Sequence, residues 1–493
     1  MSAKRIKKIL FIIPPNTISA DSLRRIGEPM GVLYISSMLK QRGYDVEVFD
    51  ASCEGYDRLE KKENYVTYGS SEADIRKRIR ESCADIIGVT CMFSSRESDM
   101  LKVCGLIKDQ DPAMPVVAGG LHPSLFPERI LKAGLVDFVI IGEGELRLCN
   151  LLDDLNSGKN GFDFDGIAYK EADTIKVNPV VERIEDLSAL PYPDRDLVNM
   201  ERYIDIGIPF APYALEKRVA QVLATRGCPN RCNFCAAVNF WGRKVRTRSV
   251  ENIIGEMTLL KERYGVKEIQ FVDDNLTANK PLAKELFKRM KGLDLKWCTP
   301  NGVMFNTIDG EMLSLMADSG AYQLSFGIES ASLRVLKEII HKNVRLDMVK
   351  GLIEEAHTHD ISVHGMFIVG FPGETKEEVR QTLSFPFKAG FDSASFFIVS
   401  PLPGSEIYDE CISKKYINAA NTGVDFKSAK IEIPSDSPDY NFSTEELEEL
   451  VDKTTREFNE HARILYPDKW EKKFRRFLAD HKGYKKTIMG RVT

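Results

Sequence analysis

Short apolar runs, separated by stretches of helical length, constrain the fold of the first 160 residues more than any other feature. The runs are largely uninterrupted by polar residues, as in strands that are buried on both faces of a parallel sheet. Between two of them, Val32, Ile35 and Leu39 recur at helical spacing. Such alternation predicts an α/β fold with a doubly wound, Rossmann-like parallel sheet. The runs are Ile9–Ile13, Val46–Phe49, Ile86–Thr90, Val116–Ala118 and Phe138–Ile141.

A chain of 493 residues is too long for one ordinary domain. From residue 219 onward six further strand patterns alternate with helical ones, which predicts a partial (β/α)6 barrel with its site at the carboxyl ends of the strands. Pro191 and Pro193 indicate an extended connector before it. The predicted parts are a sheet domain (1–160), a linker (161–210), the barrel (211–415) and a C-terminal helical region (416–493). In this last part, Ser443 and Glu446 form a capping-box pattern.

Small residues follow several strands of the predicted sheet, where open α/β sheets bind ligands. These segments are 14–17, 90–95, 118–124 and 142–145. Small side chains let the backbone approach a flat ligand closely, although ordinary tight turns use the same residues. The first strand lacks the G-x-G-x-x-G pattern, so a dinucleotide is not favoured.

The stretch TRGCPNRCNFC (225–235) places Cys228, Cys232 and Cys235 at C-x3-C-x2-C spacing. Three thiols cannot pair among themselves, and a zinc site normally takes four Cys or His ligands. A redox C-x-x-C leaves the third cysteine unexplained. The polar residues between them argue against a buried core. An iron–sulfur cluster therefore remains, and three thiolates leave one iron of a four-iron cluster open.

This cysteine spacing, with Phe234 before the last thiol, resembles the motif of radical SAM enzymes. Residues 27–51, 86–94, 116–124 and 137–145 are similar to the cobalamin-binding domain fused to such enzymes. The resemblance covers roughly residues 5–415. It implies a 4Fe-4S cluster held by the three cysteines, S-adenosyl-L-methionine (SAM) chelated to the open iron, and cobalamin on the N-terminal sheet.

The resemblance also implies contact residues. Two sets follow from matching the motifs. Contacts to SAM are expected at Asp273, Asp274, Asn275, Ser325, Glu329, Ser330, Gly370 and Pro372. Contacts to cobalamin are expected at Thr90, Ser94, Gly119, Gly120, His122, Gly142 and Glu143.

Two further residues raise separate hypotheses. The D-x-H-x-x-G motif that supplies a cobalt ligand in other cobalamin domains is absent, so the resemblance implies no histidine below the cobalt. His122 is then a loop or corrin-edge residue. Cys298, expected near a strand end facing the pocket, is a candidate hydrogen-atom or proton donor, with a buried small side chain as the alternative.

The family resemblance implies a methyltransferase that moves a methyl group from SAM, through methylcobalamin, to an unactivated carbon of a small-molecule, lipid or natural-product substrate. Cyclisation, ring contraction and C–C coupling without methyl transfer remain alternatives, as does a non-catalytic cobalamin-binding sensor. A tRNA methylthiotransferase is disfavoured, because Cys53, Cys83, Cys91 and Cys104 do not form a second cysteine trio.

Charge and composition predict the cellular compartment and the partners of the protein. A net charge of −5 gives no reason to expect nucleic acid, and ten cysteines in this length do not resemble a secreted disulfide scaffold. Ile9–Ile13 is too short for a signal peptide, and no run approaches a membrane span. We expect a cytoplasmic enzyme with an external flavodoxin- or ferredoxin-like electron donor. The basic end (466–493) is expected to be a solvated surface or a site for an anionic substrate or lipid headgroups.

Overall fold

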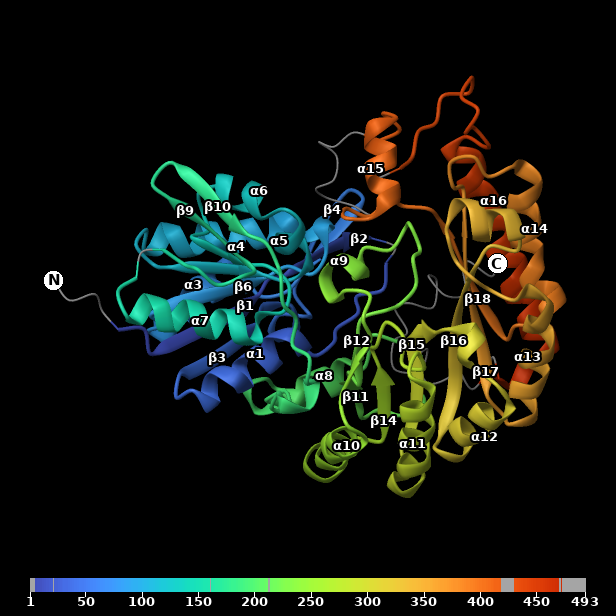
Figure 1. Cartoon of the computed structure of the whole chain (residues 1–493), viewed down its shortest axis with the longest axis horizontal. Helices are drawn as coiled ribbons and strands as arrows, with labels where there is room; N and C mark the ends of the chain where they lie inside the picture. Colours follow the sequence, from blue (N-terminus) through green and yellow to red (C-terminus); the bar gives the residue numbers. More distant parts are fainter. Residues whose placement is uncertain are drawn as a thin grey trace. The chain divides into compact units, whose positions relative to one another are not determined.

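The computed structural model describes residues 5–20, 22–159, 161–211, 213–417, 430–469 and 471. Within these residues the chain forms two compact units that meet in sequence between Ile206 and Gly207. Each unit is built around a largely parallel sheet, shown in Figure 1.

The first unit contains a seven-stranded sheet in the order β10-β9-β8-β7-β6-β1-β3. Its five parallel strands follow the spatial order 2-1-3-4-5, a common doubly wound arrangement. This confirms the predicted fold class. The strands are β1 (Lys8–Ile13), β3 (Asp45–Asp50), β6 (Ile86–Thr90), β7 (Val116–Gly119) and β8 (Phe138–Ile140).

Helices cover both faces of this sheet, which explains why its strands are apolar on both sides. Alternate residues of β1 enter different cores: Leu10 lies in one cluster and Phe11 in the other. The Phe11 cluster includes residues of α1 (Met30–Gln41) and α7 (Gly144–Asn156). The Leu10 cluster includes residues of α3 (Glu72–Ser82) and α4 (Glu97–Gln110).

Two features of the first unit differ from expectation. Residues 161–210 are not a linker throughout, because β9 (Ile167–Glu171) and β10 (Thr174–Asn178) form a hairpin that extends the main sheet antiparallel. An edge hairpin has few buried residues, so its apolar pattern is weak. Likewise, β2 (Asn16–Ser19), β4 (Leu59–Lys62) and β5 (Tyr65–Tyr68) form a small antiparallel sheet. The rest of the predicted linker contains short 3-10 turns and α8 (Met200–Ile206).

The second unit contains six parallel strands in sequence order, as a partial barrel requires. They are β11 (Val219–Val222), β14 (Glu268–Phe271), β15 (Lys296–Val303), β16 (Ala321–Glu329), β17 (Ser362–Val369) and β18 (Ser393–Ile398). The helices between them pack on one face in a single core. They are α10 (Val250–Tyr264), α11 (Lys280–Met290), α12 (Gly310–Asp318), α13 (Val349–Thr358) and α14 (Lys376–Ala389).

Local signals set the ends of these helices. The Ser249 side chain accepts a hydrogen bond from Asn252 N at the start of α10, and Gly265 ends the helix in a left-handed conformation. The predicted capping box of Ser443 and Glu446 begins α16 (Thr444–Leu465). This helix places Phe458 against Phe387 and Phe396 of the barrel unit. Most of the basic end (466–493) lies outside the described residues.

Candidate functional site

The three-cysteine loop lies between β12 (Thr225–Arg226) and α9 (Ala237–Trp241), directly beyond the first barrel strand. Asn233 anchors it. Its backbone N–H donates to Ile340 O, its side-chain Nδ2 donates to Ile339 O at 2.6 Å, and its carbonyl accepts from Ile407 N at 3.1 Å. These bonds join the loop to the segment after β16 and to α15 (Glu406–Ser413).

The chemistry of the three thiols differs from that of the other cysteines. Of the ten, Cys228, Cys232 and Cys235 alone are half-buried; six are buried and Cys83 is exposed, and none forms a disulfide. Burial raises the pKa of Cys232 to about 11, although the positive charge of Lys342 lowers it. Thiolates held in such surroundings need a cationic partner, and the irons of a cluster supply one.

The described residues contain no group of three or more His, Cys, Asp or Glu side chains that could hold a single metal ion. Thiolates that hold a four-iron cluster each bind a different iron, so they need not converge on one point. The half-buried trio therefore fits a cluster and does not fit a mononuclear site.

Three predicted residues follow β14, and they have different surroundings. Asp273 is buried; its Oδ1 accepts from Ala224 N, Thr225 N and Thr225 Oγ1 at 3.1, 2.5 and 2.7 Å. Burial raises its pKa to about 6. This carboxylate thus ties the end of β14 to the start of the cysteine loop.

Asp274 and Asn275 retain unused acceptors. Within the described part of the chain, no hydrogen bond or ion pair holds the Asp274 carboxylate, and burial raises its pKa to about 6. Asn275 is buried, its Nδ2 lies 3.5 Å from Met304 Sδ, and its Oδ1 has no partner there. Buried acceptors without donors suit a cationic ligand such as an ammonium group.

Strand β16 and the residue after it carry three other predicted residues. Glu329 is buried, has a left-handed φ of 64°, and its Oε1 accepts from Lys342 Nζ at 2.7 Å. Non-glycine residues in this conformation concentrate at functional sites. Ser325 is buried within the strand beside Thr299. Ser330 lies in the interior, where its Oγ contacts Thr382 Oγ1 at 3.1 Å.

The loop after β17 contains Gly370 and Pro372. Gly370 has a φ of 85°, which favours glycine, and Pro372 is buried. The Oε2 of Glu374 accepts from Gly370 N and Phe371 N and holds the turn. The Phe371 ring lies 5.9 Å from Phe234 of the cysteine loop, so the two loops are in contact.

The expectation that Cys298 lies near the pocket-facing, carboxyl end of its strand is wrong. It is the third residue of β15, is fully buried, and interacts with Tyr322, the second residue of β16. The Tyr322 hydroxyl donates to Glu268 at the first position of β14. Cys298 therefore lies in the amino-terminal half of β15, which runs on to Val303.

In the first unit, Thr90, Gly119 and Gly120 lie at the carboxyl ends of β6 and β7. A Cβ on Gly119 would have no atom within 4 Å, so the space beside it is open. Gly120 has a φ of 103°, and a Cβ there would lie 2.6 Å from Cys91 O. A flat ligand can approach this backbone closely.

His122 is buried and has no free ring nitrogen. Its Nδ1 contacts Ser94 Oγ at 2.9 Å and its Nε2 contacts Glu97 Oε2 at 2.6 Å. Arg129 donates to the other oxygen of Glu97. This network fits a cobalamin without a protein histidine on cobalt, because both nitrogens are engaged.

Gly142 and Glu143 follow β8. Gly142 has a φ of 76°, and its N–H donates to Ser124 Oγ at 2.9 Å. Glu143 is buried, and its Oε2 accepts from Ile184 N at 3.1 Å. Glu143 thus holds the segment after the hairpin, a role that its sequence position did not indicate.

A parallel sheet with open loops, followed by a partial barrel with a three-cysteine loop, defines a class of enzyme that uses a corrinoid and SAM. The chain belongs to the cobalamin-dependent radical SAM family. Residues 17–152 match the B12 binding domain, and residues 222–385 match the radical SAM superfamily. Its cofactors are cobalamin, SAM and a 4Fe-4S cluster.

Known relatives match most of the chain. The cytidylyl-2-hydroxyethylphosphonate methyltransferase of Streptomyces wedmorensis is 33% identical over 92% of this chain and 90% of its own. An uncharacterised methyltransferase of Pyrococcus horikoshii is 31% identical over 95% of both chains. The radical SAM methyltransferase TsrM of Kitasatospora setae has a similar fold, with a TM-score of 0.68 at 17% identity over 83% of this chain and 76% of that one.

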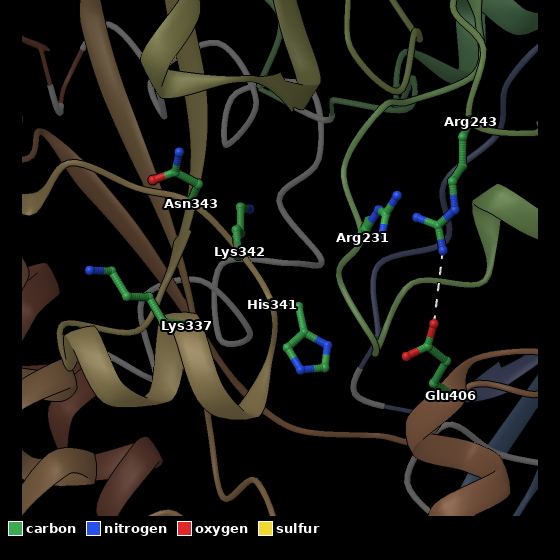
Figure 2. Close-up of a pocket in the computed structure, with 7 residues that line it drawn as sticks. All are labelled: Arg231, Arg243, Lys337, His341, Lys342, Asn343 and Glu406. Atoms are coloured by element: carbon green, nitrogen blue, oxygen red, sulfur yellow. Dashed lines mark ion pairs between the residues drawn. The ribbon is translucent and has the colours of Figure 1, made fainter.

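Sequence reasoning missed a set of basic residues beside the cysteine loop, which Figure 2 shows around a cavity of about 760 Å³. Arg231 lies inside the cysteine motif itself, and Lys342 holds Glu329. Arg231, the basic residue between the cysteines, was a visible signal, but its convergence with residues 337–343 depends on the fold. No described helix is long and apolar enough to cross a membrane.

Proposed function

We propose that the enzyme transfers a methyl group from SAM to a carbon atom of an anionic small molecule. The half-buried cysteine trio beside the unpartnered acceptors Asp274 and Asn275 carries this proposal. Relatives that are methyltransferases and align over nearly the whole chain support it.

The bound cofactors supply the difficult chemistry: the cluster with SAM generates a radical, and cobalamin carries the methyl group. The protein supplies binding, orientation and electrostatics. In this assignment Cys228, Cys232 and Cys235 hold the cluster. Asp273 fixes the loop through Thr225, so that the thiols keep their spacing.

Asp274 and Asn275 then accept hydrogen bonds from the SAM ammonium group. This pairing satisfies a half-buried carboxylate and a buried amide oxygen that otherwise lack donors. Glu329 at the end of the fourth strand and Ser325 within it are assigned to the ribose and carboxylate of SAM. Gly370 and Pro372 shape the loop for adenine, and Ser330 positions the strand end from within.

On the N-terminal sheet, Gly119 lets cobalamin approach the backbone, Gly120 allows the tight turn after β7, and Thr90 lies on the neighbouring strand. Ser94 and His122 belong to the network with Glu97, so they stiffen the loop below the corrin. Gly142 and Glu143 hold the next loop.

The substrate class rests on the Streptomyces wedmorensis relative, which by its name acts on a cytidylyl phosphonate. A 33% identity over 92% of this chain supports a related anionic substrate. Reduction of the cluster requires an external electron donor of the flavodoxin or ferredoxin type.

Following the labelled methyl group of SAM under anaerobic conditions tests this function. Protein reconstituted with iron, sulfide and hydroxocobalamin receives a strong reductant, methyl-labelled SAM and a cytidylyl phosphonate. We expect S-adenosylhomocysteine, label in the cobalamin fraction, and label in the organic product. Formation of 5′-deoxyadenosine alone, with no label in the cobalamin fraction, would instead assign the enzyme to cyclisation or rearrangement.

A further inference from the structure

We propose that the cavity beside the cysteine loop binds the phosphate or phosphonate group of the substrate. This inference rests on the proposed function and identifies the site for the anionic part of that substrate. The cavity has a volume of about 760 Å³, within the range of small-molecule sites. Its lining includes Arg231, Arg243, Lys337, His341, Lys342 and Glu406.

The charge balance of this cavity favours an anion. Four of its side chains are basic: those of Arg231, Arg243, Lys337 and Lys342. Two carboxylates offset them: Glu406 lies 3.8 Å from Arg243, and Glu329 pairs with Lys342 at 2.7 Å. In the part of the chain that the structure describes, Arg231 and Lys337 have no such partner.

These cations come from separate segments that converge. Arg231 lies between two of the cysteines, and Arg243 follows α9 by two residues. Lys337 and Lys342 belong to the segment after β16, on the opposite side of the cavity in Figure 2. The hydrogen bonds of Asn233 to Ile339 and Ile340 fasten the cysteine loop to that segment. The two sides of the cavity therefore keep a fixed separation, which reduces the entropy lost when a ligand binds.

The side chains match the geometry of a tetrahedral oxyanion. Arginine offers a planar fork of N–H donors for two phosphate oxygens, and lysine offers a compact charge. The ion pair with Glu329 also holds Lys342 in place, and Arg231 belongs to the cysteine loop itself. An anion bound in this cavity lies beside the loop proposed to hold the cluster. The rest of a nucleotide-sized ligand then lies near the same loop.

A protein partner, such as an acidic electron carrier, is the main competitor for these charges. A hollow of this volume favours a small ligand, because protein interfaces of ordinary size present broad surfaces of about 800 Å² per partner. The proposal therefore commits to a small molecule, and docking of an acidic carrier becomes an outcome that overturns it.

Binding of inorganic pyrophosphate tests the site without requiring turnover. The reconstituted full chain is titrated with pyrophosphate by calorimetry, and the variants Arg231→Gln and Lys337→Gln are compared with it. Each substitution should weaken binding about tenfold or more, because each removes a charged donor. The matched control is Lys350→Gln on α13, whose lysine is exposed and does not line the cavity. Control binding should equal that of the unaltered protein.

Three results overturn the proposal: no pyrophosphate binding, equal binding by all variants, or equal weakening by the control. A fourth is a loss of activity in Lys337→Gln that appears with a flavodoxin as reductant and disappears with dithionite, since this identifies a docking surface. Failure of the methyl-transfer assay with pyrophosphate binding intact would instead count against the proposed function alone. Iron content and cluster absorbance of each variant confirm that the cysteine loop is intact.

Discussion

Lys342 Nζ lies 2.7 Å from Glu329 Oε1, and the two side chains are only 16% and 10% exposed. Burial by itself lowers the pKa of Lys342, but the negative charge of Glu329 helps to raise it above its ordinary value. The ammonium group therefore stays charged and holds Glu329 in its left-handed conformation at the end of β16. One ion pair thus links the barrel strand, the cysteine loop and the basic cavity.

Replacing Lys342 with methionine should lower the free energy of unfolding by about 2–4 kcal/mol, since it leaves Glu329 as an unpaired buried charge. Urea unfolding of the cofactor-free protein measures this. The double variant with Glu329→Gln should recover most of the loss. If the two substitutions lower stability independently, the residues are not coupled as the structure indicates.

Replacing Cys232 with alanine should abolish the cluster and SAM cleavage while cobalamin content stays unchanged. The reason is that a thiolate ligand is lost from one unit, while the sheet domain of the other is untouched. Iron analysis and 5′-deoxyadenosine formation measure the outcome. The control is Cys83→Ala, because Cys83 is the exposed cysteine. Retained SAM cleavage in Cys232→Ala would remove the cluster assignment.

The adjacent residues Asp273 and Asp274 should respond differently to substitution by alanine. Asp273→Ala should lower the free energy of unfolding by about 1–3 kcal/mol, because the buried donors of Ala224 and Thr225 lose their acceptor. Asp274→Ala should leave stability nearly unchanged and weaken SAM binding about tenfold. Each variant serves as the control for the other. Equal effects of both on SAM affinity would contradict the separate roles.

Glu374 should make stability depend on pH. Burial raises its pKa to about 8, although two backbone N–H groups lower it, and its Oε1 has no partner among the described residues. The folded state thus holds a proton that the unfolded state releases near pH 4.5, so stability falls as the pH rises from about 4.5 to 8. The contribution is at most about 5 kcal/mol.

Replacing Glu374 with glutamine mimics the protonated side chain. The Glu374→Gln variant should therefore show a weaker dependence of stability on pH. Urea unfolding of the cofactor-free protein at pH 6 and pH 8 measures the difference. The control is Glu377→Gln on the exposed start of α14. A slope in Glu374→Gln equal to that of the unaltered protein would show that Glu374 is ionised throughout.

Substitutions at Gly119 and Gly120 should have different effects, because Gly119 borders open space and Gly120 has a positive φ. Gly119→Leu should lower cobalamin content and leave the stability of the cofactor-free protein unchanged, because a side chain there enters open space. Gly120→Ala should itself destabilise the fold by about 1–3 kcal/mol, because of its positive φ and the contact with Cys91 O. Unchanged cobalamin content in Gly119→Leu, with the cluster spectrum intact, would count against the proposed cobalamin site.

Periodicity and local motifs in the sequence determined much of the fold and the cofactor class of this protein. Apolar runs predicted the five parallel strands of the first sheet, because burial on both faces leaves a continuous pattern in the chain. The caps at Ser249 and Ser443 act over three residues, so they too are visible in the sequence. The cysteine spacing predicted the cofactor class, because the three cysteines also lie close together in the sequence.

Contacts between distant segments were decided by the tertiary structure alone. The hairpin Ile167–Asn178 was missed because an edge pair buries few side chains and leaves a weak pattern. Cys298 was expected at the carboxyl end of its strand, but β15 continues to Val303 through residues that are less apolar than its start. Lys342 meets Glu329 across thirteen residues, and Arg231 and Lys337 line one cavity only in the folded chain. Sequence patterns record the local preferences of the chain, whereas a site assembled from several loops depends on where packing brings those loops together.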